Sequence, residues 1–108
     1  MRKWLDGLCK LFRDQPLPPF NQARLIDVRT PAEYSRGHLE GALSLPLDQV
    51  ASQARTRFPD LEGPIVVYCQ SGMRSAMARK TLLGLGYQQV FNGGGIAKLA
   101  RRMARSSS

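Results

Sequence analysis

The 108-residue chain has few of the residues that build disulfide frameworks, metal centres or membrane anchors. Its only cysteines are Cys9 and Cys69, and its only histidine is His38. Two cysteines are too few for a disulfide framework and their spacing fits no zinc motif, so we expect neither a metal nor a cofactor. No apolar run approaches the roughly 18 residues of a membrane-spanning helix.

Acidic residues are also scarce, at 8 against 16 lysines and arginines, which gives a formal net charge of +8. A basic balance fits nucleic acid, an anionic membrane surface or small anionic substrates. The charge is scattered, except near the C-terminus at Lys98, Arg101, Arg102 and Arg105. No zinc-finger spacing, basic heptad array or aromatic RNA-binding motif accompanies it, so we expect no nucleic-acid partner.

The N-terminus lacks a complete secretion signal, although Met1-Arg2-Lys3 provides a basic start. Asp6 and Lys10 interrupt the apolar stretch that such a signal needs, and no small-residue cleavage site follows. From these residues we expect a cytoplasmic protein. The length predicts a single domain, which we place at residues 20–105, with a disordered tail at 106–108.

Residues 3–13 predict an amphipathic helix ahead of that domain. Its apolar face is formed by Trp4, Leu5, Leu8, Leu11 and Phe12. Two interpretations stay open: the helix packs on the domain, or it contacts a membrane surface or a partner. Prolines at 16, 18 and 19 end the helix and make a stiff connector, which completes the segment 1–19.

Short apolar runs alternate with short helical patterns along the rest of the chain. We expect strands at 25–29, 43–45, 65–69 and 89–91, and helices at 31–36, 48–57, 75–84 and 96–103. The first helix begins with Thr30 as its cap and Glu33 at its third position. Asp48 is the expected cap of the second, whose inner stripe is Leu47, Val50, Ala51 and Ala54. Gly93-Gly94-Gly95 predicts a turn that needs unusual backbone angles or close approach. The alternation predicts an α/β domain with a mainly parallel sheet.

The strand at 65–69 ends in Cys69, and a short loop then leads into the helix expected to begin at Ser75. A strand, tight loop and helix in this order aim backbone N–H groups and a helix N-terminus at one point. These donors favour the thiolate of Cys69 over its thiol, and Arg74 adds a permanent positive charge. We therefore predict a nucleophilic cysteine in an anion-binding loop made of Gln70, Ser71, Gly72, Met73, Arg74 and Ser75.

Charged residues on the neighbouring strand are expected to support this loop. Asp27 and Arg29 lie near the carboxyl end of their strand, and in a parallel sheet that end shares an edge with Cys69. A charge in a buried strand needs a partner, so we expect an ion pair or loop-anchoring hydrogen bonds, with contact between Arg29 and substrate as the alternative. His38 is expected to fix a loop by a hydrogen bond.

Without an evident base beside Cys69, the chemistry has to start from an already ionised sulfur. Two reactions fit such a nucleophile. One is attack on the sulfane sulfur of an anion such as thiosulfate, and the other is attack on a phosphoryl group.

Several spaced motifs occur between residues 23 and 102. The upstream motifs are Leu25-Ile26-Asp27-Val28-Arg29, Pro31-Ala32-Glu33-Tyr34 and Gly37-His38-Leu39-Glu40-Gly41-Ala42. The cysteine loop is Val67-Tyr68-Cys69-Gln70-Ser71-Gly72-Met73-Arg74-Ser75, and the closing motif is Leu85-Gly86-Tyr87 with Gly94-Gly95. Together these motifs resemble those of the rhodanese superfamily, which implies a three-layer rhodanese-like domain with this loop as its active site.

The resemblance also implies a thiosulfate sulfurtransferase. Cys69 would take a sulfur atom from thiosulfate, release sulfite and become a persulfide, which the N–H groups of residues 70–74 hold. Arg74 would attract and orient the anionic donor. Cyanide, a small thiol or a protein dithiol would then accept the sulfur. We expect a monomer.

Two alternatives to a sulfurtransferase stay open. Phosphatases built on the rhodanese fold have a loop one residue longer, whereas four residues separate Cys69 from Arg74 here. The shorter loop suits a sulfur atom better than a phosphate, which leaves a phosphatase or arsenate reductase as the weaker enzymatic interpretation. The other alternative is an idle rhodanese-like module that binds a partner, against which the intact cysteine loop argues.

One departure from the family concerns the end of the chain. Many members carry a tryptophan shortly after the double glycine, and here that place is taken by Leu99 or its neighbour. This feature resembles the small phage-shock sulfurtransferases, which are often exported, so a periplasmic location is the alternative to the cytoplasm. Cys9 is expected to pack on the apolar face of its helix, with disulfide formation to a loaded Cys69 as the alternative.

Overall fold

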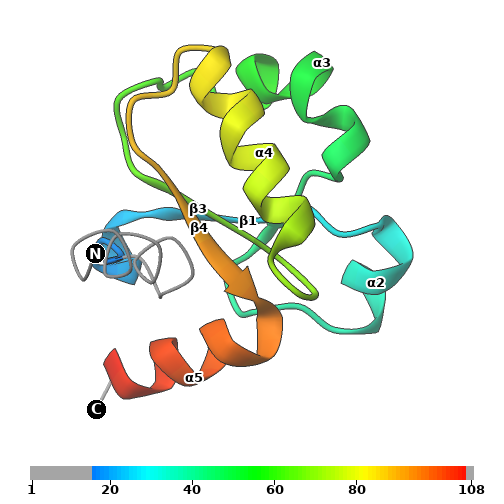
Figure 1. Ribbon diagram of the computed structural model, residues 1–108, viewed down its shortest axis with the longest axis vertical. Helices are drawn as coiled ribbons and strands as arrows, with labels where there is room; N and C mark the ends of the chain where they lie inside the picture. The colour runs from blue at the N-terminus through cyan, green and yellow to red at the C-terminus, as the bar shows by residue number, and fades with distance from the viewer. Residues whose placement is uncertain (1–15, 107–108) are drawn as a thin grey trace, which may run out of the picture.

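The structure is a computed structural model that describes residues 16–106, and it consists of one sheet with helices on both faces (Figure 1). Its elements are η1 (Phe20–Gln22), β1 (Arg24–Asp27), α2 (Pro31–Arg36), β2 (Leu43–Ser44), α3 (Leu47–Arg57), β3 (Ile65–Cys69), α4 (Met73–Gly84), β4 (Val90–Gly95) and α5 (Ile96–Ser106). The alternation confirms the predicted α/β class. The helix expected at 3–13 and Cys9 lie outside the described residues.

The sheet has four parallel strands in the order β2-β1-β3-β4. All five residues of β3 are buried, as its continuous apolar sequence predicts for a strand covered on both faces. The register between β1 and β3 runs from Arg24 opposite Ile65 to Asp27 opposite Tyr68. The carboxyl ends of these two strands therefore meet at one edge of the sheet, which places Asp27 next to the strand that ends in Cys69.

Side chains of β3 alternate between two separate parts of the core, because successive residues of a strand point to opposite faces. Ile65, Val67 and Cys69 pack with residues of α3 and α4, whereas Val66 and Tyr68 pack with residues of α5 and η1. Figure 1 shows α3 and α4 on one side of the sheet and α5 on the other. Cys69 thus lies on the face covered by α4, the helix that follows it in the chain.

Helix α3 begins with a backbone contact and not with a side-chain cap. The Leu47 amide donates to the Val28 carbonyl at 3.0 Å, and no side chain caps the helix. The expectation that Asp48 is the cap is therefore wrong, since Asp48 already lies in the first turn. The expected inner stripe of α3 is confirmed except at Ala51, which is exposed.

Helix α4 begins at Met73, two residues before the predicted start at Ser75. Gly72 precedes it with a φ of 101°, a left-handed conformation that glycine adopts without strain. This sharp turn lets the helix start directly after the loop. Ala78 and Leu82 bury the inner face of the helix.

The segment 93–95 continues strand β4, so the prediction of a turn there is wrong. The register places Asn92 opposite Val67 but Gly94 opposite Tyr68, which makes Gly93 the extra residue of a bulge. A Cβ on Gly93 would lie 2.8 Å from Leu99 Cδ2 and 3.2 Å from the Val67 carbonyl oxygen, so a side chain there would have to displace its buried neighbours.

The strand leads directly into α5, which extends to Ser106 and so reaches one residue into the segment expected to be a disordered tail. Within residues 16–106, no helix is long and apolar enough to cross a membrane.

Candidate active site

Cys69 ends β3, and the side chain has no exposed surface. Its Sγ accepts hydrogen bonds from the Gly72 amide at 2.9 Å and from the Ser75 amide at 3.4 Å. The Ser75 hydroxyl also lies 3.4 Å from Sγ. The loop that follows β3 therefore surrounds the sulfur with hydrogen-bond donors.

Opposing effects act on the pKa of Cys69. Burial raises it, because a charged sulfur loses its contact with water. Hydrogen bonds from the hydroxyl and amide of Ser75 and from the amides of Gly72 and Ser71 lower it, and they prevail, so the pKa lies below its ordinary value. The N-terminus of α4 points the positive end of its dipole at the same place. The site thus favours a thiolate, the nucleophilic form of cysteine.

The loop packs closely against β4, and glycine makes this contact possible. A Cβ on Gly95 would lie 2.6 Å from the Gln70 carbonyl oxygen and 3.4 Å from Ser71 Cα. A Cβ on Gly72 would lie 3.4 Å from Gly94 Cα. Gly94 and Gly95, which lie far from Cys69 in the sequence, therefore form the surface against which its loop packs.

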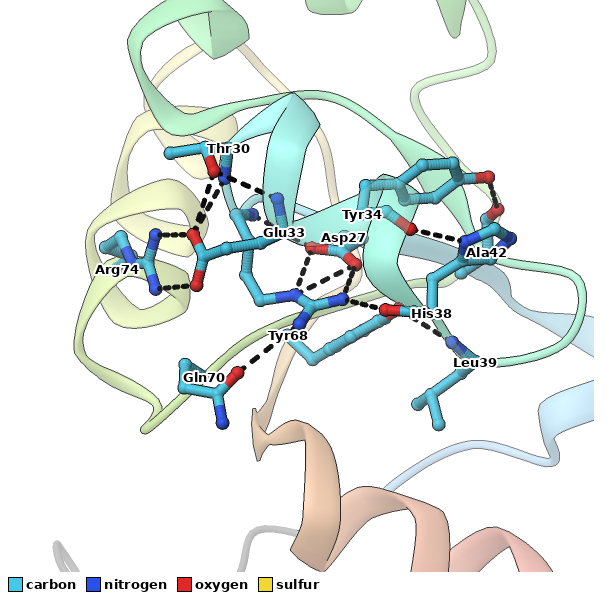
Figure 2. Close-up of polar contacts among 12 residues, drawn as sticks. Asp27, Thr30, Glu33, Tyr34, His38, Leu39, Ala42, Tyr68, Gln70 and Arg74 are labelled. Atoms are coloured by element: carbon cyan, nitrogen blue, oxygen red, sulfur yellow. Dashed lines mark hydrogen bonds and ion pairs between the residues drawn. The ribbon is translucent and has the colours of Figure 1, made fainter.

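Arg74 forms a two-pronged ion pair with Glu33 of α2 (Figure 2). Nη1 lies 2.6 Å from Oε1, and Nη2 lies 3.0 Å from Oε2. Glu33 also closes the predicted capping box with Thr30, so the same carboxylate starts α2 and holds Arg74. The hydrogen bond from Arg74 lowers the pKa of Glu33 to about 2. The sequence predicts a free positive charge at the loop, whereas the structure pairs that charge with a carboxylate.

Asp27 and Arg29 form the buried ion pair that the sequence predicts, with 2.7 Å between Arg29 Nη2 and Asp27 Oδ2. Arg29 extends further, to the Gly37 carbonyl at 2.7 Å and to Gln70 Oε1 at 3.3 Å. It thereby links β1 to the end of α2 and to the first residue of the cysteine loop. The structure shows Arg29 as an anchor of that loop.

His38 fixes the segment after α2. Its Nδ1 lies 2.9 Å from the Tyr34 carbonyl oxygen, and its ring stacks on the Tyr34 ring with 3.7 Å between centroids. Tyr34 in turn donates its hydroxyl to the Ala42 carbonyl at 2.7 Å (Figure 2). These are loop-fixing contacts of the kind expected of His38.

Asn92 of β4 is the polar residue at the site that sequence reasoning misses. Its Oδ1 lies 2.6 Å from Ser75 Oγ, and its Nδ2 donates to the Gly72 carbonyl at 3.2 Å. The signal that could have identified it is a side-chain amide inside a short strand beside three glycines, because a half-buried amide needs hydrogen-bond partners. The sequence places Ser75 in the loop but does not predict the contact of its hydroxyl with Sγ.

The remaining loop residues divide by exposure. Gln70, Ser71 and Met73 are exposed, and Met73 has 77% of its surface accessible. These three side chains are therefore directed to solvent, unlike that of Ser75, and substrate binding by these residues stays a prediction. No cluster of three or more histidine, cysteine or acidic side chains that could hold a metal occurs in the part of the chain that the structure describes.

Comparison with known proteins places these features in a family. Residues 13–101 match the family model of the rhodanese-like domain. The chain is 37% identical over 94 residues to the thiosulfate sulfurtransferase PspE of Escherichia coli, covering 87% of this chain and 90% of that one. It is 38% identical over 88 residues to a sulfurtransferase of Allochromatium vinosum, covering 81% and 80%.

Solved structures agree with the fold. A rhodanese from E. coli determined with anions superposes with a TM-score of 0.67 at 37% identity, covering 70% of this chain and 89% of that one. The human single-domain sulfurtransferase TSTD1 superposes with a TM-score of 0.67 at 29% identity, covering 91% and 93%. The similarity thus extends over nearly the whole length of these small proteins.

Proposed function

The chain belongs to the rhodanese-like family and is a thiosulfate sulfurtransferase, and we propose that it transfers sulfur through a persulfide on Cys69. The observation that carries the proposal is the position of Sγ at the N-terminus of α4, where it accepts hydrogen bonds from the amides of Gly72 and Ser75. We further propose that residues 20–105 form the domain that performs this reaction. Its proposed location is the cytoplasm, with the periplasm as the alternative.

In the first half-reaction, the Cys69 thiolate attacks the sulfane sulfur of thiosulfate. A bond forms between Sγ and that sulfur as the sulfur–sulfur bond of thiosulfate breaks, and the bonding electron pair leaves with sulfite. The negative charge then resides on the terminal sulfur of the persulfide. Backbone N–H groups of residues 70–74 would stabilise this charge without having to reorganise.

In the second half-reaction, an acceptor nucleophile attacks the terminal sulfur. The bond between the two sulfurs breaks, its electron pair returns to Sγ, and the Cys69 thiolate is regenerated. Cyanide would leave as thiocyanate, and a small thiolate or a protein dithiol would leave carrying the extra sulfur. One nucleophile thus serves both steps, and the lowered pKa of Cys69 makes it a good leaving group in the second.

Arg74 is proposed to orient the sulfonate end of the donor. Its guanidinium interacts electrostatically with Cys69, which supports a role toward an anion bound there. The ion pair with Glu33 reduces the charge that it presents. We therefore expect Arg74→Ala to raise the KM for thiosulfate more than it lowers kcat.

Intact mass spectrometry before and after thiosulfate tests the covalent step. The wild-type chain should gain the mass of one sulfur atom, and cyanide or a reductant should remove it. Cys69→Ser should show neither the gain nor thiocyanate formation, whereas the matched variant Cys9→Ser should retain both. Normal turnover by Cys69→Ser would contradict the mechanism.

Assays with a phosphate ester and with arsenate, beside the thiosulfate experiment, separate the alternatives. A phosphatase or arsenate reductase would hydrolyse a chromogenic phosphate ester or reduce arsenate in a Cys69-dependent way and would gain no sulfur from thiosulfate. A rhodanese-like binding module would do none of these. The distance of four residues between Cys69 and Arg74 supports the sulfurtransferase over the phosphatase.

A further inference from the structure

Asn92 contacts several groups around the cysteine loop, and the backbone fixes the orientation of its side-chain amide. Oδ1 accepts the Gly94 amide at 2.9 Å, and Nδ2 donates to the Gly72 carbonyl at 3.2 Å. In the opposite orientation Nδ2 would face the Gly94 amide, so that two donors would meet. Oδ1 would face the Gly72 carbonyl, so that two acceptors would meet. Oδ1 therefore faces Ser75, and the Ser75 hydroxyl has to donate to it.

The Ser75 hydroxyl has one proton and several acceptors within reach. Its Oγ lies 2.6 Å from Asn92 Oδ1, 3.1 Å from the Gly72 carbonyl oxygen and 3.4 Å from Cys69 Sγ. The Gly72 carbonyl already accepts the Ala76 amide at 3.1 Å and Asn92 Nδ2. The main competition for the hydroxyl proton is therefore between Asn92 and the sulfur.

A thiol and a thiolate make opposite demands on this hydroxyl. A Cys69 thiol can donate its proton to Ser75 Oγ while the hydroxyl donates to Asn92. A thiolate only accepts, so the hydroxyl can bond to it only by turning its proton toward Sγ, which leaves Oδ1 with the Gly94 amide alone. On ionisation the thiol proton leaves to solvent, and the hydroxyl proton stays on Oγ and changes only its direction. In a persulfide Sγ carries no charge, and the hydroxyl can return to Asn92.

We propose that Asn92 is a positioning residue that competes with Cys69 for the Ser75 hydroxyl and thereby favours the states in which Sγ is uncharged, the thiol and the persulfide. Asn92 does not touch the sulfur and acts through Ser75. The inference rests on the proposed sulfur transfer at Cys69. To that mechanism it adds a hydrogen-bond acceptor, Asn92 Oδ1, which binds the Ser75 hydroxyl while Cys69 carries the transferred sulfur.

The charged groups that surround the sulfur are paired with one another and stay in place as the hydroxyl turns. On α4, Arg74 is bound to Glu33 of α2. At the end of β1, Asp27 is bound to Arg29. Strand β4 contributes no titratable side chain. A change in the ionisation of Cys69 on substitution of Asn92 therefore reports on the hydroxyl and the loop.

The test measures the pKa of Cys69 from the pH dependence of its alkylation by iodoacetamide, in a Cys9→Ser background so that one thiol reacts. Ser75→Ala removes a donor and should move the midpoint to higher pH. Asn92→Ala removes the competing acceptor and should move it to lower pH, with roughly threefold faster alkylation below the midpoint, the size that one hydrogen bond supports. If Asn92 had a merely structural role, its removal would loosen the loop, and Asn92→Ala would shift the midpoint to higher pH, as Ser75→Ala does.

The double variant decides whether Asn92 acts through Ser75. In the Ser75→Ala background, Asn92→Ala should no longer lower the midpoint. A raised or unchanged midpoint in Asn92→Ala alone, or a lowering that persists without the hydroxyl, overturns the proposal. Alkylation needs no thiosulfate, so a failure here is distinct from a failure of sulfur transfer.

A second variant serves if Asn92→Ala does not fold. Asn92→Asp keeps the shape of the side chain and makes Oδ1 a stronger acceptor. It should raise the midpoint more when the Ser75 hydroxyl is present than in the Ser75→Ala background. Equal shifts in the two backgrounds overturn the proposal.

Discussion

At the scale of single residues, the Arg74–Glu33 ion pair bears on the donor-binding role proposed for Arg74. Its Oε1 accepts the Thr30 amide at 3.0 Å and Arg74 Nη1 at 2.6 Å, while Oε2 is engaged by Arg74 Nη2. One carboxylate therefore joins the start of α2 to the cysteine loop. If Arg74 binds the donor as proposed, the donor meets a cation that already has a partner, and removal of that partner should strengthen donor binding.

Glu33→Gln tests this coupling. The amide oxygen can keep the capping bond to Thr30, but the charge is lost and Nε2 faces the donor Nη2 of Arg74. We expect the KM for thiosulfate to fall roughly threefold with kcat little changed, the scale of a partly exposed ion pair. Steady-state kinetics check this, with Glu62→Gln as a control that makes the same charge change at an exposed position. An unchanged or higher KM specific to Glu33→Gln would show that Arg74 does not act on the donor.

The same carboxylate predicts a pH dependence of stability. The pKa of Glu33 is lowered from 4.5 to about 2 in the folded protein, chiefly by the hydrogen bond from Arg74. A group whose folded pKa is lowered stabilises the fold above its unfolded pKa, and this contribution is lost as the pH falls through the folded value. The free energy of unfolding should therefore decrease between pH 4.5 and about 2.

Urea unfolding at a series of pH values measures the effect. Glu33→Gln, which has no charge to lose, should show a shallower decrease over this window than the wild-type chain. Parallel curves for the two proteins would show that the ion pair contributes nothing to the acid sensitivity. Glu62→Gln again serves as the control.

At the scale of elements, the contact between β4 and the cysteine loop depends on glycine. A Cβ on Gly95 would lie 2.6 Å from the Gln70 carbonyl oxygen, a backbone atom that cannot move without the loop. Gly95→Ala should therefore destabilise the fold by about 1–3 kcal/mol, as overpacking does. It should also raise the pKa of Cys69, because the displaced loop aligns its amides less well with Sγ.

Chemical denaturation and alkylation measure the two effects of Gly95→Ala. Gly84→Ala is the matched control, since an added Cβ there has no neighbour within 4 Å and the residue ends a helix. Its effect on stability should stay within about 1 kcal/mol, and the reactivity of Cys69 should not change. If Gly95→Ala behaves like this control, the loop does not depend on the close contact.

Local chemistry explains which elements could be predicted from the sequence. The capping box of Thr30 and Glu33 is a contact between residues three apart, and the apolar run of β3 carries its own signal. The predicted cap of α3 is wrong because the carbonyl of Val28, the residue after β1, takes the place of a side chain. The turn expected at the glycines of β4 is wrong because these residues continue the strand, whereas the close approach expected there is confirmed by their contacts with Leu99 and the cysteine loop.

The residues of the candidate site likewise divide into those that the sequence could predict and those that it could not. Cys69 and its loop are contiguous in sequence, so their donors could be anticipated from one stretch. The partner of Arg74 is 41 residues away, and Asn92 is 17 residues from Ser75. Such pairs depend on how α2 and β4 are placed around β3, and a pattern read along one segment does not contain that information.

At the scale of the whole molecule, the sheet separates the site from much of the core. Cys69 belongs to the apolar cluster that includes Ala78 and Leu82 of α4. Leu99 of α5 belongs to the cluster on the other face. Both leucines are fully buried, so they permit a comparison in which the same side chain is truncated on either side of the sheet.

Leu82→Ala and Leu99→Ala should each destabilise the fold by about 2–5 kcal/mol, because each leaves a cavity in a packed core. We expect Leu82→Ala to lower kcat as well, since it loosens the helix whose first turn supplies the Ser75 amide to Sγ. Leu99→Ala should retain kcat when assayed well below its unfolding temperature, because α5 supplies no hydrogen bond to the sulfur among those the structure describes. A loss of kcat in Leu99→Ala as large as in Leu82→Ala would mean that the two faces do not act independently and that sulfur transfer depends on the packing of the entire sheet.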